Sequence, residues 1–429
     1  MQLQTPEGYR FLDEEDVKAF VAALPSVRQR LGEEPAAWSV GEVGDGNLNL
    51  VFLVDGPDGS CCVKQSLPYV RLVGPDWPMP LERAFFEHEC MVDHGRHVGR
   101  LIPEVYHYDP EMFAIVMEKL SPHIIMRRGM IDGVVYPKFA EDIAEYCAQT
   151  LFKTSTLFLP AEAVKQRVAV FAGNTELCRI TEDLIFTDPY RANERNRWTS
   201  PQLDPVKAAF EADTELKLAI SRLKLKFMGS TEALLHGDLH TGSVMLTPDD
   251  TRIIDPEFAF YGPRGFDLGA VIGNLLINFF AQDGHAAEGR PSETPRAAYQ
   301  AWVLETIEAF WAGFRARFIA LWEAEGKGDG YPHDLFADEA GRSALAEERE
   351  RFMDIMLHEA LGFAGAKMIR RILGLAHNID LEWIEDPDIR AKCERKCLSL
   401  ARELVLETGS FNDITAVTRR AREVAAAAG

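Results

Sequence analysis

Two short acidic motifs, each preceded by an apolar run, constrain this 429-residue chain more than any other feature. The first is His-Gly-Asp at 236–238, and the second is Asp-Pro-Glu at 255–257. Apolar runs that stop at such motifs are typical of strands ending in loops, so the pattern predicts that the acids meet beside one hairpin. Carboxylates gathered in this way repel one another unless a divalent cation lies among them. The pattern therefore favours a site for phosphoryl transfer.

Each acid has an expected role. Asp238 is the candidate catalytic base, or the group that orients an attacking hydroxyl, since positioning matters more than basicity in phosphoryl transfer. Asp255 and Glu257 are the candidate metal ligands, and Pro256 stiffens the turn between them. Protein kinases carry a magnesium-binding asparagine where this chain has Ser243. Because a hydroxyl is a poorer ligand for a hard cation, we expect metal binding to fall on Asp255 and Glu257.

The residues around these motifs are expected to support the loop. We predict that His236 braces it through hydrogen bonds. Asp267 lies where kinase-like lobes use an aspartate to hold the loop's backbone. His240 can approach a phosphate or be satisfied within the loop, and the sequence favours neither. Arg264 can meet the substrate or pair with surface acids, and both options stay open.

A glycine-rich stretch and a lysine predict where a nucleotide would bind. The candidate phosphate-binding residues of the stretch are Gly44, Asp45, Gly46 and Asn47. Their backbone N–H groups could approach phosphate oxygens closely, although such a run is also an ordinary hairpin turn. Lys64, on the next predicted strand, can neutralise phosphates, while its local sequence alone favours a solvated edge lysine. Either Glu87 or Glu89 could orient this lysine, and spacing does not choose between them.

The order of predicted elements indicates an α+β, two-lobed, protein-kinase-like fold. Residues 1–118 are predicted to form a small β-rich lobe with one helix at 83–94. Residues 119–429 are predicted to form a larger, mostly helical lobe that contains the acidic motifs. Its long helices are expected at 138–156, 205–223, 295–326, 340–377 and 387–408. The crossover resembles the linker of kinase-like folds, and its candidate adenine-reading residues are Met117, Glu118 and Leu120.

Composition excludes several classes of partner. The formal charge of −21 argues against nucleic acid, because phosphate backbones need a basic surface. No apolar run reaches membrane-spanning length, and the chain shows no basic-then-apolar leader. The seven cysteines show no paired spacing, and Cys393 and Cys397 are interpreted as buried thiols on a helix. We therefore expect a protein of the reducing cytoplasm with neither a nucleic-acid nor a membrane partner.

Longer blocks give the chain a resemblance to a known family. They are GDGNLN at 44–49, KQSLPYVR at 64–71, WPM at 77–79, HGDLHTGS at 236–243, DPEFAFYG at 255–262 and KMIRR at 367–371. On these blocks the chain resembles the methylthioribose kinases, within the aminoglycoside phosphotransferase and choline kinase superfamily. The resemblance implies ATP with Mg²⁺, a homodimer, and phosphorylation of the 1-hydroxyl of 5-methylthioribose in methionine salvage.

The resemblance also implies residue roles. Asp238 matches the family's catalytic aspartate, and Asp255 and Glu257 match its metal-binding acids. The substrate-binding residues implied are Asp238, Asn47, Trp77, Arg370 and Arg371. Trp77 lies in a proline-bounded stretch that is expected to be a surface loop. Since adjacent helical residues point roughly 100° apart, one of the two arginines is expected to face solvent.

Three other functions compete with this interpretation. The alternative enzyme is a sister phosphotransferase acting on choline, homoserine or an aminoglycoside. Choline would need an aromatic cage, and the paired arginines disfavour any cationic substrate beside them. A non-catalytic nucleotide-binding scaffold would lack at least one of Lys64, Asp238 and Asp255, and all are present. A protein kinase is disfavoured because no Ala-Pro-Glu-bounded segment follows residues 255–257.

Overall fold

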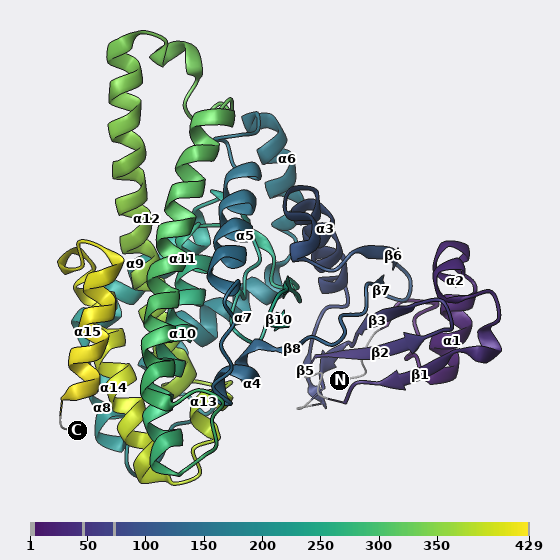
Figure 1. The fold of residues 1–429 in the computed structure, drawn as a ribbon, viewed down its shortest axis with the longest axis horizontal. Coiled ribbons are helices and arrows are strands. Elements are labelled where there is room, and N and C mark those ends of the chain that lie inside the picture. Colours follow the sequence, from purple (N-terminus) through teal and green to yellow (C-terminus); the bar gives the residue numbers. More distant parts are fainter. Residues whose placement is uncertain (1–4, 45–47, 72–73, 428–429) are drawn as a thin grey trace.

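The computed structural model describes residues 5–44, 48–71 and 74–427. A small lobe of strands lies beside a larger lobe of helices (Figure 1). This arrangement confirms the predicted α+β, two-lobed class. The exact lobe boundary at 118/119 stays a prediction. No helix in the described part of the chain combines the length and apolar character needed to cross a bilayer.

A five-stranded antiparallel sheet forms the small lobe. Its order is β1 (Ser39–Glu42), β2 (Asn49–Asp55), β3 (Ser60–Ser66), β7 (Ala114–Met117) and β6 (Val105–Asp109). The predicted strands are confirmed. Residues alternate between the two faces of β3, so Val63 is buried against one core while Lys64 points to the opposite face. This alternation is what aims Lys64 toward α3 (Arg83–Val98).

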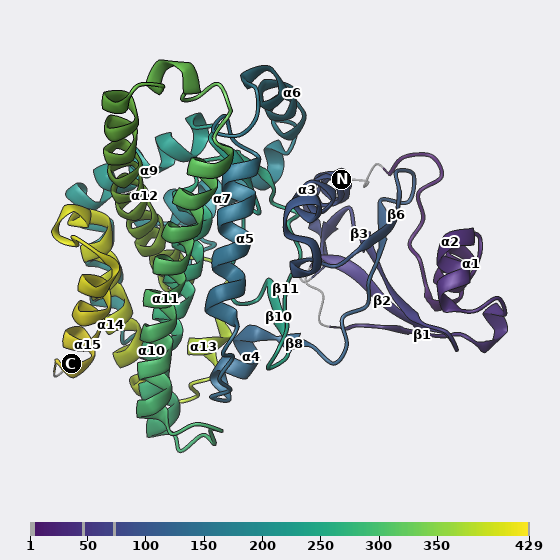
Figure 2. The same ribbon diagram turned by 45° about the horizontal axis from the view of Figure 1, so that its top comes forward.

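The prediction of a single helix in this lobe is wrong. Two short helices, α1 (Glu14–Ala22) and α2 (Pro25–Leu31), precede the sheet and cover its far face with Val17 and Leu31. Asp13 and Asp16 form a capping box at the start of α1, which is the sequence signal that would have revealed it. The third helix, α3, lies between the sheet and the large lobe (Figures 1 and 2).

Helices make up most of the large lobe. They are α4 (Met126–Ile131), α5 (Phe139–Lys153), α6 (Ala161–Phe171), α7 (Thr175–Phe186), α8 (Asp204–Ala212), α9 (Thr214–Gly229), α10 (Gly265–Ala287), α11 (Arg296–Glu325), α12 (Glu339–Leu373), α13 (Ile379–Glu382), α14 (Pro387–Leu406) and α15 (Ile414–Ala426). The central helix α10 is buried along nearly its whole length and packs against α11, α12 and α14. The cysteines Cys393 and Cys397 of α14 are buried free thiols, as predicted.

Most of the predicted long helices are confirmed, with one correction. The expected helix at 205–223 is two helices, α8 and α9. They separate at Asp213, whose extended backbone interrupts the helix and whose side chain accepts a hydrogen bond from the Leu216 amide to cap α9. Asp213 is also anchored by Arg402, a contact that no local pattern could predict.

Short strands carry the two acidic motifs. They are β8 (Ile124–Ile125), β9 (Ala233–Leu235), β10 (Val244–Leu246), β11 (Thr251–Ile253) and β12 (Phe260–Gly262). The β10–β11 hairpin also pairs with β8, whereas β9 pairs with β12. The first motif therefore lies between β9 and β10, and the second between β11 and β12. The strand pairing places the two motif loops side by side, and a hydrogen bond from Ile254 N to Ser243 O joins them.

Candidate active site

Lys64 is surrounded by carboxylates. Its Nζ is 2.7 Å from Glu87 Oε1 on α3, and it also forms an ion pair with Asp255. The structure thus selects Glu87 over Glu89, which lies instead beside His88 at 3.1 Å. The interpretation of Lys64 as a solvated edge residue is wrong, since its side chain is 11% exposed.

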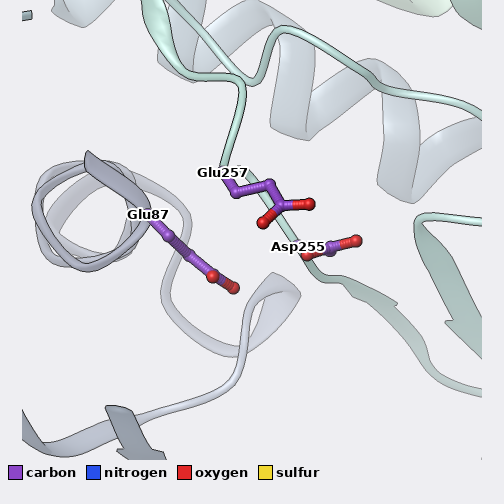
Figure 3. A group of neighbouring side chains, drawn as sticks. All are labelled: Glu87, Asp255 and Glu257. Atoms are coloured by element: carbon purple, nitrogen blue, oxygen red, sulfur yellow. The ribbon is translucent and has the colours of Figure 1, made fainter. Parts of the chain in front are cut away.

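Three carboxylates are grouped closely enough to bind one metal ion. Ligand oxygens of Glu87, Asp255 and Glu257 all lie within 4.8 Å of one another. Figure 3 shows Glu87 reaching from its helix toward the two acids on the facing loop. Glu87 joins the two predicted metal ligands in this group, and Asp238, which was predicted to be the catalytic aspartate, is not part of it. An all-oxygen set of this kind suits a hard cation such as Mg²⁺.

The electrostatics of this group favour a cation. Burial and the charge of Asp255 raise the pKa of Glu257, even though Lys64 and Arg83 oppose the rise. Burial likewise raises the pKa of Glu87 to about 7. Burial acts to lower the pKa of Lys64, but the surrounding carboxylates outweigh it and hold that pKa above its usual value. Negative charge in this pocket therefore exceeds what Lys64 and Arg83 balance.

Backbone strain is stored at Asp255. Its φ is +69°, in the left-handed region that residues other than glycine, asparagine and aspartate seldom adopt. Such a residue costs about 1 kcal/mol or more and persists where the surroundings hold it. The turn directs the carboxylate at Lys64 while leaving the side chain 44% exposed. A carboxylate that is paired on one side and open on the other can still take a further ligand.

Arg83 is a site residue that the sequence interpretation missed. Its side chain is completely buried, and Nε donates to Glu257 Oε2 at 3.2 Å. The remaining N–H groups donate to Leu67 O, Pro80 O, Leu48 O and Asn49 Oδ1. Asn49 in turn donates to Glu257 Oε2 at 3.2 Å. Arg83 therefore fixes Glu257 to the small lobe, and with it the acidic loop of the large lobe.

We expect Arg83→Met to destabilise the protein. Removing one partner of a buried pair leaves the other charge uncompensated, so the unfolding free energy should fall by about 3 kcal/mol. Urea unfolding followed by tryptophan fluorescence would measure the change. The matched control is Arg96→Met, which removes an exposed arginine from the same helix. Equal unfolding midpoints for the two variants would contradict this account of Arg83.

Asp238 lies between a lysine and a histidine of the large lobe. Lys367 Nζ is 3.1 Å from its Oδ1, and His240 Nε2 is 3.2 Å from its Oδ2. Burial acts to raise the pKa of Asp238, but His240, Lys367 and Arg371 outweigh it and hold the pKa well below its usual range. Burial also lowers the pKa of His240 to about 3, so its imidazole is neutral and donates a hydrogen bond. Asp238 is thus a fixed, ionised acceptor.

Hydrogen bonds hold the loop around Asp238. Asp267 accepts from the amides of His236 (2.8 Å) and Gly237 (3.1 Å). His236 Nε2 donates to Ile254 O at 2.9 Å, joining the two motif loops. Ser243 Oγ donates to Asp238 O at 2.9 Å, so this hydroxyl is engaged with the loop backbone. These contacts agree with the bracing roles expected of His236 and Asp267.

The backbone at position 237 explains why the residue between His236 and Asp238 is a glycine. Its φ is +84°, and a Cβ at this position would lie 2.1 Å from Phe258 O. Any side chain would therefore push the first acidic loop away from the second. The glycine permits the close approach that brings the two motifs together.

Lys367 is a second residue that the sequence interpretation left without a role. It is 2% exposed and lies 4.2 Å from the centre of the Phe266 ring. Its charge helps to keep the Asp238 carboxylate ionised, so removal of that charge should raise the pKa of Asp238. Because an ionised acceptor is required, activity lost on acidification should then be lost at higher pH.

We therefore predict that Lys367→Met moves the acid limb of the kcat/KM–pH profile to higher pH. Lys367→Arg keeps the charge and should leave the limb close to that of the wild type. Steady-state rates across a pH series would measure both variants. An acid limb that stays in place in Lys367→Met would show that Lys367 does not act through Asp238.

The arginine pair of α12 faces inward. Arg371 is 7% exposed and donates from Nη1 to Ala376 O at 3.0 Å, so the expectation that one of the pair faces solvent is wrong. Arg370 is half-buried, and burial together with Arg371 lowers its pKa to about 9. The charge of Asp238 acts on both guanidinium groups. Arg264, by contrast, pairs with Glu232 away from this site.

Other predicted residues lie outside this constellation or beyond the described chain. Asp45, Gly46 and Asn47 fall outside the described residues, while Gly44 precedes them after β1. Trp77 is half-buried on β5 (Gly74–Pro78), which pairs with β4 (Tyr69–Val70), so the expectation of a plain loop there is wrong.

The predicted linker begins where β7 ends. Met117 is the last residue of that strand, and the amide of Glu118 donates to Glu104 O at 2.8 Å. The side chain of Glu118 accepts from Arg252 Nη1 at 2.8 Å, and Leu120 is half-buried. The roles of Met117, Glu118 and Leu120 in binding adenine stay predictions.

The fold and the site together define a phosphotransferase with a kinase-like architecture. Residues 39–302 match the phosphotransferase enzyme family. Methylthioribose kinase 1 of Oryza sativa subsp. japonica is 46% identical over 411 residues, covering 95% of this chain and 94% of the relative. Methylthioribose kinase of Escherichia coli is 43% identical over 418 residues, covering 97% and 98% respectively. The chain belongs to the methylthioribose kinase family.

Proposed function

We propose that this protein transfers the γ-phosphoryl group of ATP, with Mg²⁺, to the 1-hydroxyl of 5-methylthioribose in methionine salvage. The observation that carries the proposal is the division of charge in the site. Carboxylates gather around Lys64 on one side, and cations gather around Asp238 on the other. The family relatives are named for the same substrate, which supports the choice of acceptor.

In this proposal Asp238 orients the acceptor. Its carboxylate accepts a hydrogen bond from the sugar hydroxyl while Lys367 and His240 hold it in place. The hydroxyl oxygen bonds to the γ-phosphorus as the bond from that phosphorus to the ADP oxygen breaks. The hydroxyl proton passes to Asp238 and then to solvent. Because the depressed pKa of Asp238 makes it a weak base, its main contribution is alignment.

The small lobe supplies the nucleotide side. Lys64 would pair with nucleotide phosphates, with Glu87 keeping its ammonium group in position. Glu87, Asp255 and Glu257 would hold Mg²⁺, because they offer carboxylate oxygens, the ligands this cation prefers, within 4.8 Å of one another. Bound there, the metal would supply positive charge beside the phosphates. Arg83 keeps Glu257 in place through its buried hydrogen bond to Oε2.

The arginine pair supports a neutral or anionic acceptor over a cationic one. The charge of Asp238 acts on both Arg370 and Arg371. Repulsion from their charges would weaken the binding of choline or an aminoglycoside. A neutral sugar has no such penalty, and its phosphorylated form gains from these charges.

A panel of acceptors tests the proposal. Release of ADP from ATP should be measured with 5-methylthioribose, ribose, choline, homoserine and an aminoglycoside. We expect the highest kcat/KM with 5-methylthioribose. A higher kcat/KM for choline, homoserine or the aminoglycoside would overturn the proposed acceptor and leave the phosphotransferase class standing.

We also propose that the enzyme works as a homodimer in the cytoplasm. The seven free cysteines fit a reducing compartment, where thiols are kept unpaired. On α9, the apolar side chains of Leu225 and Met228 are 72% and 59% exposed, which suits a surface that another protein covers. Light scattering on the purified protein tests the dimer directly, and a monomeric mass at assay concentration would contradict it.

A further inference from the structure

A third arginine lies beside the catalytic loop. Arg127 is on α4, and its backbone amide donates to Thr241 O at 3.0 Å. Its Nε donates to Thr241 Oγ1 at 3.0 Å, and its Nη2 donates to Asn274 Oδ1 at 3.1 Å. The side chain is only 11% exposed. Arg127 is therefore fixed against the loop that carries Asp238, not free at the surface.

A buried carboxylate forms an ion pair with Arg127. Asp380 is completely buried, and its Oδ2 is 3.4 Å from Arg127 Nε. Its Oδ1 accepts from Asn278 Nδ2 at 2.6 Å. The remaining nitrogen, Nη1, points toward the loop, since a Cβ added to Gly242 would lie 3.1 Å from it. Within the described chain, Nη1 donates no hydrogen bond.

Around the loop that carries Asp238, positively charged side chains outnumber negatively charged ones. The positive groups Lys367, Arg127, Arg370 and Arg371 are opposed by three carboxylates, those of Asp238, Asp267 and Asp380. The Nε atoms of Arg370 and Arg371 are buried without a partner among the described residues. Burial, together with the charge of Arg371, lowers the pKa of Arg127 to about 10. Buried guanidinium groups with unused donors are typical of a site that takes an anion.

We propose that Arg127 joins Arg370 and Arg371 to bind the phosphoryl group once it is on the acceptor, with Asp380 as the residue that positions Arg127. This inference rests on the proposed function and deepens it. After transfer, a phosphate monoester carries about −1.5 to −2 charges at neutral pH. That charge lies next to the Asp238 carboxylate and is repelled by it. Three guanidinium groups offset this repulsion and retain the sugar phosphate after the sugar itself has reacted.

Binding of the sugar and of its phosphate separates this role from a structural one. Calorimetry should compare 5-methylthioribose with its 1-phosphate on the wild type and on Arg127→Met. We expect the Kd of the 1-phosphate to rise about tenfold or more in the variant, and the Kd of the sugar to change less than about twofold. The matched control is Arg128→Met, which removes an exposed arginine one residue further along α4. It should leave both Kd values unchanged.

The remaining outcomes are also decisive. Equal weakening of both ligands in Arg127→Met, or no weakening of the 1-phosphate, would overturn the proposal. If Arg127→Met does not fold, Arg127→Lys replaces it, since a lysine keeps the charge but loses the planar fork and should still weaken the 1-phosphate selectively. If the wild type binds neither 5-methylthioribose nor its 1-phosphate, the proposed acceptor is wrong. Titration with inorganic phosphate then decides the role of Arg127. An equal phosphate Kd for wild type and variant would reject it.

Discussion

Asp238→Asn should lower kcat by about 10²- to 10⁴-fold while the Kd of ATP stays within about twofold. The amide has the same shape as the carboxylate but accepts no proton and orients a hydroxyl less strongly. It also leaves Lys367 without the anion that it contacts at 3.1 Å. ATP binding should be unaffected, because Asp238 is not part of the carboxylate group around Lys64. ADP release and calorimetric titration with ATP measure the two quantities.

The matched control is Asp249→Asn. Asp249 is exposed in the turn between β10 and β11, so the change removes one negative charge from the same hairpin without touching the site. Its kcat should match that of the wild type. Turnover of Asp238→Asn at the wild-type level in a preparation free of other kinases would reject Asp238 as the catalytic aspartate.

Asp255→Asn should raise the Mg²⁺ concentration needed for half-maximal activity by about tenfold or more. Asparagine tolerates the left-handed backbone of this position as aspartate does, so the fold should survive. What is lost is the negative charge, and even groups outside the direct ligand set typically cost about 10- to 100-fold in metal affinity. Titration of the initial rate with Mg²⁺ at saturating ATP gives the value.

Ser243→Ala provides the comparison for this prediction. The Ser243 hydroxyl is engaged with Asp238 O, so its removal should slow turnover without changing the Mg²⁺ requirement. A larger Mg²⁺ shift in Ser243→Ala than in Asp255→Asn would mean that the serine, and not the Asp-Pro-Glu turn, carries the metal.

The strands and the two motif loops could be predicted because their signals are local. Alternation on β3 places Lys64 on the face opposite Val63, and the apolar run of β9 stops at the His-Gly-Asp turn. The order of these elements also predicts the two lobes. Glycine at 237 would have been understood only with Phe258 O in view, since the reason for it is a contact with the second loop.

The partners of the charged residues could not be predicted, because they depend on packing. Glu87 and Glu89 lie two positions apart on α3 and point to different sides, so only the docking of α3 against the sheet selects Glu87. Charged residues in helices are mostly exposed, which made Arg83 and Lys367 look unremarkable in sequence. Both are buried, and their acidic partners lie 174 and 129 residues away along the chain.

The arginines near Asp238 were also beyond prediction from local sequence. Helical spacing correctly separates Arg370 and Arg371 in direction, but it does not reveal that neighbouring segments enclose both directions. Arg371 reaches Ala376 O beyond the end of its own helix, and Arg127 approaches from α4. The sequence near α12 therefore indicates two arginines, and only the folded lobe shows that Arg127 of α4 lies near them.

Identification of the phosphorylated product tests the central claim most directly. Wild-type enzyme should be incubated with ATP, Mg²⁺ and 5-methylthioribose, and the products followed by ³¹P and ¹H NMR. We expect one ADP for each molecule of a sugar phosphate whose phosphorus couples to the C1 proton. Phosphorus coupled to another carbon's proton, or ADP formed without any sugar phosphate, would contradict the account of how Asp238 presents the acceptor hydroxyl.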